Sequence, residues 1–140
     1  MALVRTHARL MDQVEAQLRK DHGLTIARYD VLAHLDVAGG RLGLGELGAS
    51  ITLSPSGLSK LVDRMETSGL VRRQPDPDDA RSTFAMLTPR GRSLVQKARR
   101  THHAFLHEVF GSVLVDRDLS DLVRITGRLD ASIAKGNLPE

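Results

Sequence analysis

The sequence predicts a mainly α-helical fold with one small β-hairpin, and three observations support this. Most of the chain falls into segments whose apolar side chains recur every three or four positions, which is typical of amphipathic helices. Two short β-prone runs lie close together, at residues 70–73 and 83–87. A length of 140 residues, with 41% hydrophobic and 26% charged residues, suits one folded domain.

Two helices are expected in the first 40 residues. The first runs from Leu3 to about Arg19 with one apolar stripe, and Gly23 ends it. Thr25 caps the second helix, and the pair of glycines at 39–40 closes it. The positions of this helix that are spaced for burial are Tyr29, Leu32, Ala33 and Leu35. Residues 41–43 are interpreted as a short third strand beside the hairpin.

The centre of the chain is a pair of helices joined by a tight turn. Residues 44–51 form a short helical run, and residues 52–53 leave room only for a turn. Ser54 can cap the next helix, Pro55 fits its first position, and Gly69 ends it. One face of this helix is predicted to be buried, at Leu58, Leu61, Val62 and Met65. Such a pair is a helix-turn-helix unit.

The other face of this helix carries small hydroxyl groups near its start and cations after them. Its residues are Ser56, Ser59, Lys60, Asp63 and Arg64. Hydroxyls and cations can reach base edges and phosphates in a major groove without bulk. For this segment alone, an ordinary amphipathic helix with a solvated polar face is an equally good interpretation.

The two β-prone runs are predicted to form a two-stranded hairpin with a long tip, called a wing. Several aspartates in the tip would face phosphates if they were left bare. We therefore expect at least one of these aspartates or the nearby Asp63, with Asp79 as the first choice, to pair with Arg72 or Arg73 and to stiffen the wing. Arg81 is then free to enter a narrow minor groove.

A long helix opens at Thr88-Pro89 and is expected to reach about Leu114, and Asp116 or Asp118 caps a last helix. The inner stripe of the long helix is predicted to be Leu94, Val95, Ala98, Thr101, His102, Phe105 and Val109. A compact helix-turn-helix unit needs only part of the apolar surface of the first, long and last helices. The leftover stripes predict an interface with a second copy, and a self-contained monomer is the alternative.

Residues 44–91 resemble the winged helix of the MarR family of bacterial transcription regulators. The runs SPSGLSKLVDRMETSGLVRR and DPDDARSTFAMLTPRG carry the resemblance, and Asp79-x-Arg81-Ser82 followed by Leu87-Thr88-x-x-Gly91 is its most specific part. The resemblance implies a homodimeric, winged helix-turn-helix DNA-binding protein, usually a repressor released by a small ligand. Residues 1–140 then form one such domain. Its winged helix covers about 25–90, and its dimerisation helices cover about 1–22 and 89–136.

The expected partner is a duplex with a pseudo-palindromic site, because a two-fold dimer presents two recognition helices about one helical turn, roughly 34 Å, apart. Ser56 and Arg64 are expected to contact bases and Lys60 to contact phosphate. The full set of predicted DNA-binding residues is Ser54, Ser56, Ser59, Lys60, Arg64, Arg73 and Arg81.

The resemblance also implies a small-molecule site between the dimer helices and the winged helix, often for an anionic aromatic such as a phenolic acid. The candidate ligand-binding residues are Arg5, His7, Arg9, Tyr29, His34 and His102. Arginine or histidine there would bind a carboxylate by a charge-assisted hydrogen bond. For Arg5 and Arg9, ordinary surface charge is an equally good interpretation.

The sequence leaves other functions open. His103 and His107 share a helix face at a spacing that can hold zinc, so a zinc-responsive regulator is one alternative, although neither an HExxH motif nor further ligands can be identified. A winged-helix module that binds an acidic protein partner is another. Gly43-x-Gly45-x-x-Gly48 resembles a dinucleotide fingerprint but lacks the strand and βαβ unit that such a site needs, so neither an enzyme nor a cofactor is expected.

The amino-acid composition excludes several further classes of protein function. The sequence has no cysteine, which excludes disulfides, thiolate zinc sites and thiol-based sensing. A net charge of +3 permits DNA binding without demanding it, and 3% aromatic residues argue against stacking platforms for single strands. Neither a signal peptide nor a long apolar run is found, so we expect a cytoplasmic protein without membrane contact.

Overall fold

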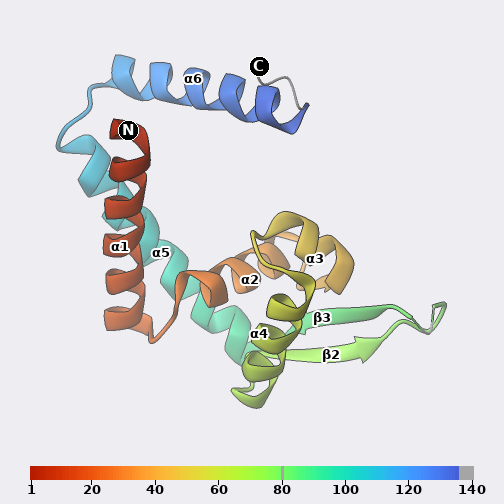
Figure 1. The fold of residues 1–140 in the computed structure, drawn as a ribbon. Coiled ribbons are helices and arrows are strands. Elements are labelled where there is room, and N and C mark those ends of the chain that lie inside the picture. The colour runs from red at the N-terminus through yellow and green to blue at the C-terminus, as the bar shows by residue number, and fades with distance from the viewer. Residues whose placement is uncertain (80, 136–140) are drawn as a thin grey trace. The chain divides into compact units, whose positions relative to one another are not determined.

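The computed structural model describes residues 1–79 and 81–135, which contain six helices and a three-stranded sheet (Figure 1). The elements are α1 (Ala2–His22), α2 (Ile26–Val37), β1 (Arg41–Gly43), α3 (Leu44–Ser50), α4 (Pro55–Thr67), β2 (Val71–Pro75), β3 (Thr83–Leu87), α5 (Pro89–Gly111) and α6 (Asp116–Ala134). The chain divides into two compact units, Met1–His103 and Ala104–Glu140. The winged helix therefore lies in the first unit.

Three predicted helix caps are confirmed. Thr25 Oγ1 accepts a hydrogen bond from the N–H of Arg28 at 3.2 Å, and Ser54 Oγ accepts one from the N–H of Gly57 at 3.1 Å. Thr88 Oγ1 accepts from the N–H of Gly91 at 3.0 Å. Each bond satisfies a backbone donor that the first turn of a helix leaves without a partner, so the sequence defines where these helices begin.

The predicted capping of the last helix is confirmed for Asp118 only, and not from the N-cap position. Val115 occupies the N-cap position of α6, and Asp116 is already its first helical residue. The carboxylate of Asp118 instead reaches back and accepts a hydrogen bond from the N–H of Val115 at 3.1 Å. An acidic residue three positions inside a helix can satisfy the start of the helix as well as one at the cap itself. α5 also ends earlier than predicted, at Gly111.

The predicted third strand is confirmed, and the sheet is antiparallel with the order β1-β3-β2. Arg41 pairs with Met86 across β1 and β3, and Val71 pairs with Leu87 across β2 and β3. Leu70 precedes β2 because its N–H still bonds to the carbonyl of Met65 and closes α4. The strand consequently starts one residue later than predicted and continues to Pro75.

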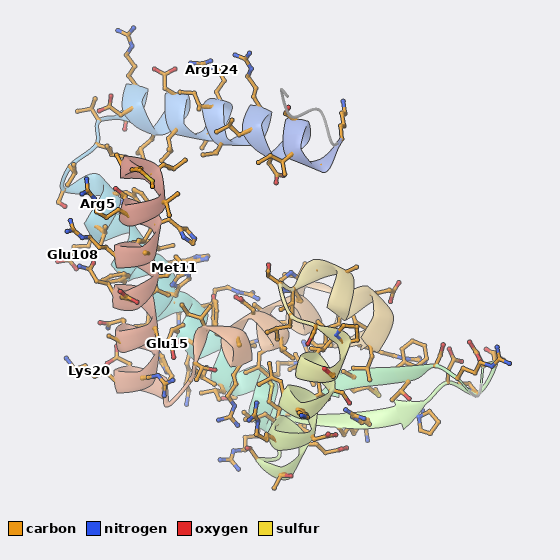
Figure 2. The ribbon with its side chains drawn as sticks, in the orientation of Figure 1. Arg5, Met11, Glu15, Lys20, Glu108 and Arg124 are labelled. Atoms are coloured by element: carbon orange, nitrogen blue, oxygen red, sulfur yellow. The ribbon has the colours of Figure 1, made fainter. Side chains whose placement is uncertain are left out.

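The core of the first unit lies between α2, α4 and the sheet. All four residues predicted for the buried face of α4 are buried, and Leu32 and Leu35 of α2 are completely so. Ala33 is only partly buried. Glu15 points from α1 toward the start of α2, where it accepts the N–H of Ile26 at 2.6 Å (Figure 2).

Close packing at the start of α5 explains the residue types in the motif Leu87-Thr88-x-x-Gly91. Thr88 Oγ1 lies 2.7 Å from the carbonyl oxygen of Gly69 and 3.1 Å from that of Leu70, which positions the turn after α4. A β-carbon at Gly91 would collide with the carbonyl oxygen of Leu70. Only glycine fits there, because a backbone group cannot move aside as a flexible side chain can.

Each unit exposes large apolar side chains. In the first unit, Leu3 and Val4 of α1 are 66% and 68% exposed. In the second, α6 has no buried residue, and its Val123 and Ile133 are 72% and 60% exposed. None of the helices in the described ranges is both long and apolar enough to cross a membrane.

Candidate nucleic-acid interface

The exposed face of α4 begins with two hydroxyl groups. Ser54 Oγ caps the helix and lies 3.3 Å from Ser56 Oγ, so the two side chains hold one another at the first turn. Lys60 and Arg64 follow on the same side and are exposed, and neither forms an ion pair with the residues that the structure describes. The opposite face is core, so α4 has only this polar surface to offer a partner.

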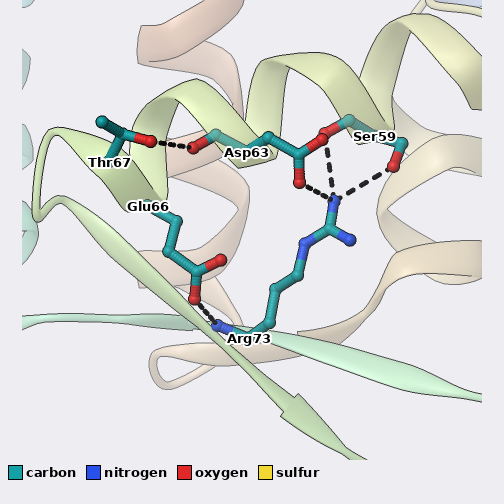
Figure 3. A network of polar contacts seen from close by, with 5 residues as sticks. All are labelled: Ser59, Asp63, Glu66, Thr67 and Arg73. Carbon is teal, nitrogen blue, oxygen red and sulfur yellow. Dashed lines mark hydrogen bonds and ion pairs between the residues drawn. The ribbon is translucent and has the colours of Figure 1, made fainter.

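Arg73 of β2 is bound to α4 rather than exposed to solvent (Figure 3). Its Nη2 donates to the carbonyl oxygen of Ser59 at 3.0 Å and to the Oγ of Ser59 at 3.1 Å, and lies 2.9 Å from Asp63 Oδ1. Its backbone N–H donates to Glu66 Oε1 at 2.8 Å. The structure thus brings two predicted DNA-binding residues, Ser59 and Arg73, together as partners within the protein.

The first choice for the predicted ion pair, Asp79, is wrong, and Asp63 makes the expected pair with Arg73 instead. Asp79 accepts hydrogen bonds from the N–H of Arg81 at 2.9 Å and from the Oγ of Ser82 at 3.0 Å. These bonds, the backbone bond first, hold the pKa of Asp79 below its usual range. A short aspartate side chain reaches the backbone two residues ahead more easily than a guanidinium on another strand, so the tip is stiffened locally.

Arg81 lies exposed near the tip of the wing, which extends beyond α3 and α4 (Figure 1). Within residues 1–79 and 81–135 its guanidinium has no hydrogen bond or ion pair. The prediction that Arg81 is free for a partner agrees with this geometry. Asp76 closes the loop from the other side, since its N–H donates to the carbonyl of Ser82 at 3.0 Å.

Sequence reasoning missed one cation on the sheet. The guanidinium of Arg41 in β1 lies over the ring of Phe84 in β3, 3.6 Å from the ring centre. This cation–π contact fixes an exposed positive charge at the base of the wing. The predicted third strand was the available signal, because an antiparallel partner places Arg41 diagonally opposite an aromatic residue.

Two candidate ligand-binding residues lie together between α2 and α5. The rings of Tyr29 and His102 meet edge to face at 5.2 Å between centres. Burial raises the pKa of Tyr29, although nearby Arg99 opposes this shift, and burial lowers the pKa of His102. The adjacent Asp30 has a pKa raised by burial, with His34 and His102 acting against it. Sequence reasoning missed Asp30 and Arg99.

Of the remaining candidates, the three on α1 make no contact with this cluster in the described ranges, whereas His34 touches its Asp30. Arg5, His7 and Arg9 are exposed along α1, and Figure 2 shows Arg5 on the first half of that helix. His34 Nδ1 bonds to the backbone carbonyl of Asp30 at 2.8 Å, so this ring is held against its own helix.

The geometry offers no support for the zinc alternative. No group of three or more histidine, cysteine, aspartate or glutamate side chains within the described part of the chain is placed to hold a metal ion. His103 and His107 therefore remain a pair on α5 without further ligands from those residues.

A helix-turn-helix with a three-stranded wing defines a winged-helix protein of the DNA-binding class. Comparison with known proteins identifies the family. Residues 22–82 match the model of the MarR family. The chain is 30% identical to AbsC, a MarR family transcriptional regulator from Streptomyces coelicolor, with a TM-score of 0.85 over 96% of this chain and 93% of that one. The chain belongs to the MarR family of DNA-binding transcriptional regulators, and not to an enzyme family.

Two further relatives agree. Sco3205, a MarR family transcriptional regulator from Streptomyces coelicolor solved in complex with DNA, is 27% identical, with a TM-score of 0.86 over 99% of this chain and 86% of that one. The HTH-type transcriptional regulator MhqR of Bacillus subtilis is 29% identical over 119 residues, which cover 85% of this chain and 80% of MhqR.

Proposed function

We propose that this protein binds duplex DNA sequence-specifically as a homodimer and represses transcription until a small ligand releases it. The observation that carries the proposal is the two-sided character of α4. Its apolar face forms the core, while Ser56, Lys60 and Arg64 occupy the exposed face next to a capped first turn. A helix with this surface can enter a major groove without burying an unpaired acid, because Asp63 is already bound to Arg73.

We assign roles by reach and by freedom from internal partners. Ser56 and Arg64 contact base edges, Lys60 contacts a phosphate, and Arg81 enters the minor groove beside the half-site. Ser54 acts mainly as the helix cap. The contacts predicted for Ser59 and Arg73 remain predictions. The hydrogen bonds between Ser59 and Arg73 indicate that both residues support the wing. Only the N–H and O–H groups that these bonds do not use can donate to DNA.

The homodimer is proposed from the exposed apolar side chains of each unit considered alone. Leu3 and Val4 on α1, and Val123, Ile125 and Ile133 on α6, are each more than 45% exposed. Apolar surface of this extent costs free energy in water unless another chain covers it. A two-fold dimer would present two α4 helices to a pseudo-palindrome with half-sites roughly 34 Å apart. The proposal places the regulator in the cytoplasm, where such DNA lies.

The proposed ligand is a small anionic aromatic such as a phenolic acid. The supporting observation is the partly buried cluster around Tyr29, His102 and Arg99, which combines rings for stacking with a guanidinium that a ligand carboxylate would share with Asp36. A ligand that binds one separation of the two α4 helices better than another would shift the population between them. The two half-sites then no longer match the two helices.

The test is binding of the whole protein to duplex from its own upstream region, at physiological salt, against random duplex. A specific regulator prefers its site by about a thousandfold or more. Tight binding with two chains per pseudo-palindrome supports the proposal, and addition of a phenolic acid should then weaken it. Equal affinity for both duplexes would contradict the proposal and favour the interaction module.

A further inference from the structure

One arginine of the first unit lacks the counter-ion that comparable arginines have. Four arginines in the described ranges are partly buried, namely Arg28, Arg73, Arg92 and Arg99. Asp63 pairs with Arg73 at 2.9 Å. The carboxylate of Asp36 lies 3.2 Å from Nη1 of Arg92 and 2.9 Å from Nη2 of Arg99. The contact with Arg99 is an ion pair whose geometry does not make a hydrogen bond. Arg28 has no carboxylate within ion-pair distance among the described residues.

The internal contacts of Arg28 leave most of its donors unused. Its Nη2 donates to Ser68 Oγ at 2.7 Å, and its Nε is buried without a hydrogen-bond partner. A guanidinium has five N–H donors, so one hydrogen bond satisfies little of its capacity. Partly buried charges in proteins are normally paired, because desolvation without a partner costs free energy. The position of Arg28 therefore points to a partner from outside the chain.

Arg28 opens into a pocket of about 520 Å³ between the start of α2 and the second half of α4. The lining consists of two arginines, three hydroxyl residues and one leucine: Thr25, Arg28, Leu61, Arg64, Thr67 and Ser68. None of these carries a negative charge. Glu15, whose carboxylate accepts the N–H of Ile26 at the start of α2, is already paired with Arg19 at 2.6 Å.

We propose that this pocket is an oxyanion site in which Arg28 binds a phosphate group, with Arg64 in its lining. Guanidinium groups bind phosphate through parallel N–H donors, and the hydroxyl of Thr25, at the positive end of α2, adds a further donor. The source of the phosphate is either the backbone of bound DNA or inorganic phosphate in solution. The DNA source rests on the proposed function, because Arg64 belongs to the exposed face of α4.

The first arm of the test measures the salt dependence of DNA binding for the whole protein. Arg28→Gln is compared with Arg28→Lys, which keeps the charge, and with Arg100→Gln, which removes the same charge from an exposed position on α5 outside the pocket. If Arg28 binds a backbone phosphate, Arg28→Gln lowers affinity for specific and random duplex alike. The slope of log affinity against log salt falls by about 0.9 per protomer, or about 1.8 for a homodimer.

The second arm measures the thermal midpoint in inorganic phosphate against chloride at equal ionic strength, without DNA. If the site takes free phosphate, phosphate raises the midpoint of the wild type and of Arg100→Gln, but not that of Arg28→Gln. A change in slope assigns the site to DNA, and a phosphate-dependent midpoint with an unchanged slope assigns it to the free ion. If Arg28→Gln matches Arg100→Gln in both arms, the proposal is overturned.

These outcomes separate the site from the proposed function. A wild type that does not prefer its own upstream duplex refutes the proposed function, yet the second arm still tests the pocket. If the wild type prefers its own upstream duplex, and Arg28→Gln changes neither the salt slope nor the effect of phosphate on the thermal midpoint, only the proposed phosphate site is refuted. Arg28→Lys guards against misfolding, because a folded Lys variant should retain most of the slope that the Gln variant loses.

Discussion

Arg73→Ala tests how the wing is attached to α4. The side chain of Arg73 is 27% exposed, and that of its partner Asp63 is 59% exposed. Nη2 carries two hydrogens, which the carbonyl and the hydroxyl of Ser59 share, while Asp63 adds an ion pair. An ion pair with so exposed a carboxylate contributes about 0.5 kcal/mol. The better-shielded bond to Ser59 contributes about 1.5 kcal/mol. The substitution should therefore lower the free energy of unfolding by about 2 kcal/mol.

The assay is urea unfolding at one fixed protein concentration, because a dimer is stabilised by mass action. Arg72→Ala is the matched control. Arg72 is the neighbouring residue on β2, is exposed, and has no ion pair in the described part of the chain, so its loss should change stability by less than about 0.5 kcal/mol. If Arg73→Ala lowers the free energy of unfolding no more than Arg72→Ala does, the contacts of Arg73 with α4 do not stabilise the protein and the reasoning is refuted.

Three further predictions follow from the same structure. Arg81→Ala should weaken operator binding by about 1–3 kcal/mol in a gel-shift titration and leave the dimer intact by sedimentation; unchanged affinity would remove the wing from the contact model. Ser54→Ala should lower the free energy of unfolding by about 1 kcal/mol through the lost cap, and an unmoved urea midpoint would show that another group caps α4. His102, whose pKa is lowered by burial, should titrate below 6.5 by NMR. Below pH 6.5 the unfolded chain then binds more protons than the folded chain, so the contribution of His102 to stability is complete above pH 6.5 and declines as the pH falls. The His102→Gln substitution should flatten that decline. A titration midpoint above 6.5 would contradict this prediction.

Local signals explain why α4 could be predicted from the sequence. The cap Ser54, the proline that follows it and the terminal Gly69 all act within a few residues of themselves. The buried face follows from periodicity alone. The turn of Thr88 onto the end of α4 is different, because its partners Gly69 and Leu70 lie far back in the sequence, and only the family resemblance pointed to this motif.

Side-chain partners were harder to predict because they depend on how the elements pack. Arg73 meets Ser59 only because β2 runs back along α4 after a tight turn, which places residues 14 positions apart in contact. Asp79 and Asp63 are chemically alike, so the sequence could not tell which of them would reach the guanidinium. Arg28 looks like any other arginine on a helix, and only its burial without a carboxylate distinguishes it.

The acidic residues near the proposed DNA surface explain how a chain of modest net charge, +3, can face a polyanion. Asp63 is paired with Arg73, and the carboxylate oxygens of Asp79 accept hydrogen bonds from the backbone and a hydroxyl group of the wing tip. Lys60 and Arg81 have no such internal partner in the described ranges. The Asp63–Arg73 pair thus compensates one acid of the α4 surface, while Asp79 keeps its negative charge near Arg81, so the local arrangement of charge matters more than the total. An Asp63→Asn variant should bind DNA more tightly than the wild type in a low-salt gel-shift titration, since it leaves the charge of Arg73 uncompensated, and an unchanged affinity would contradict this.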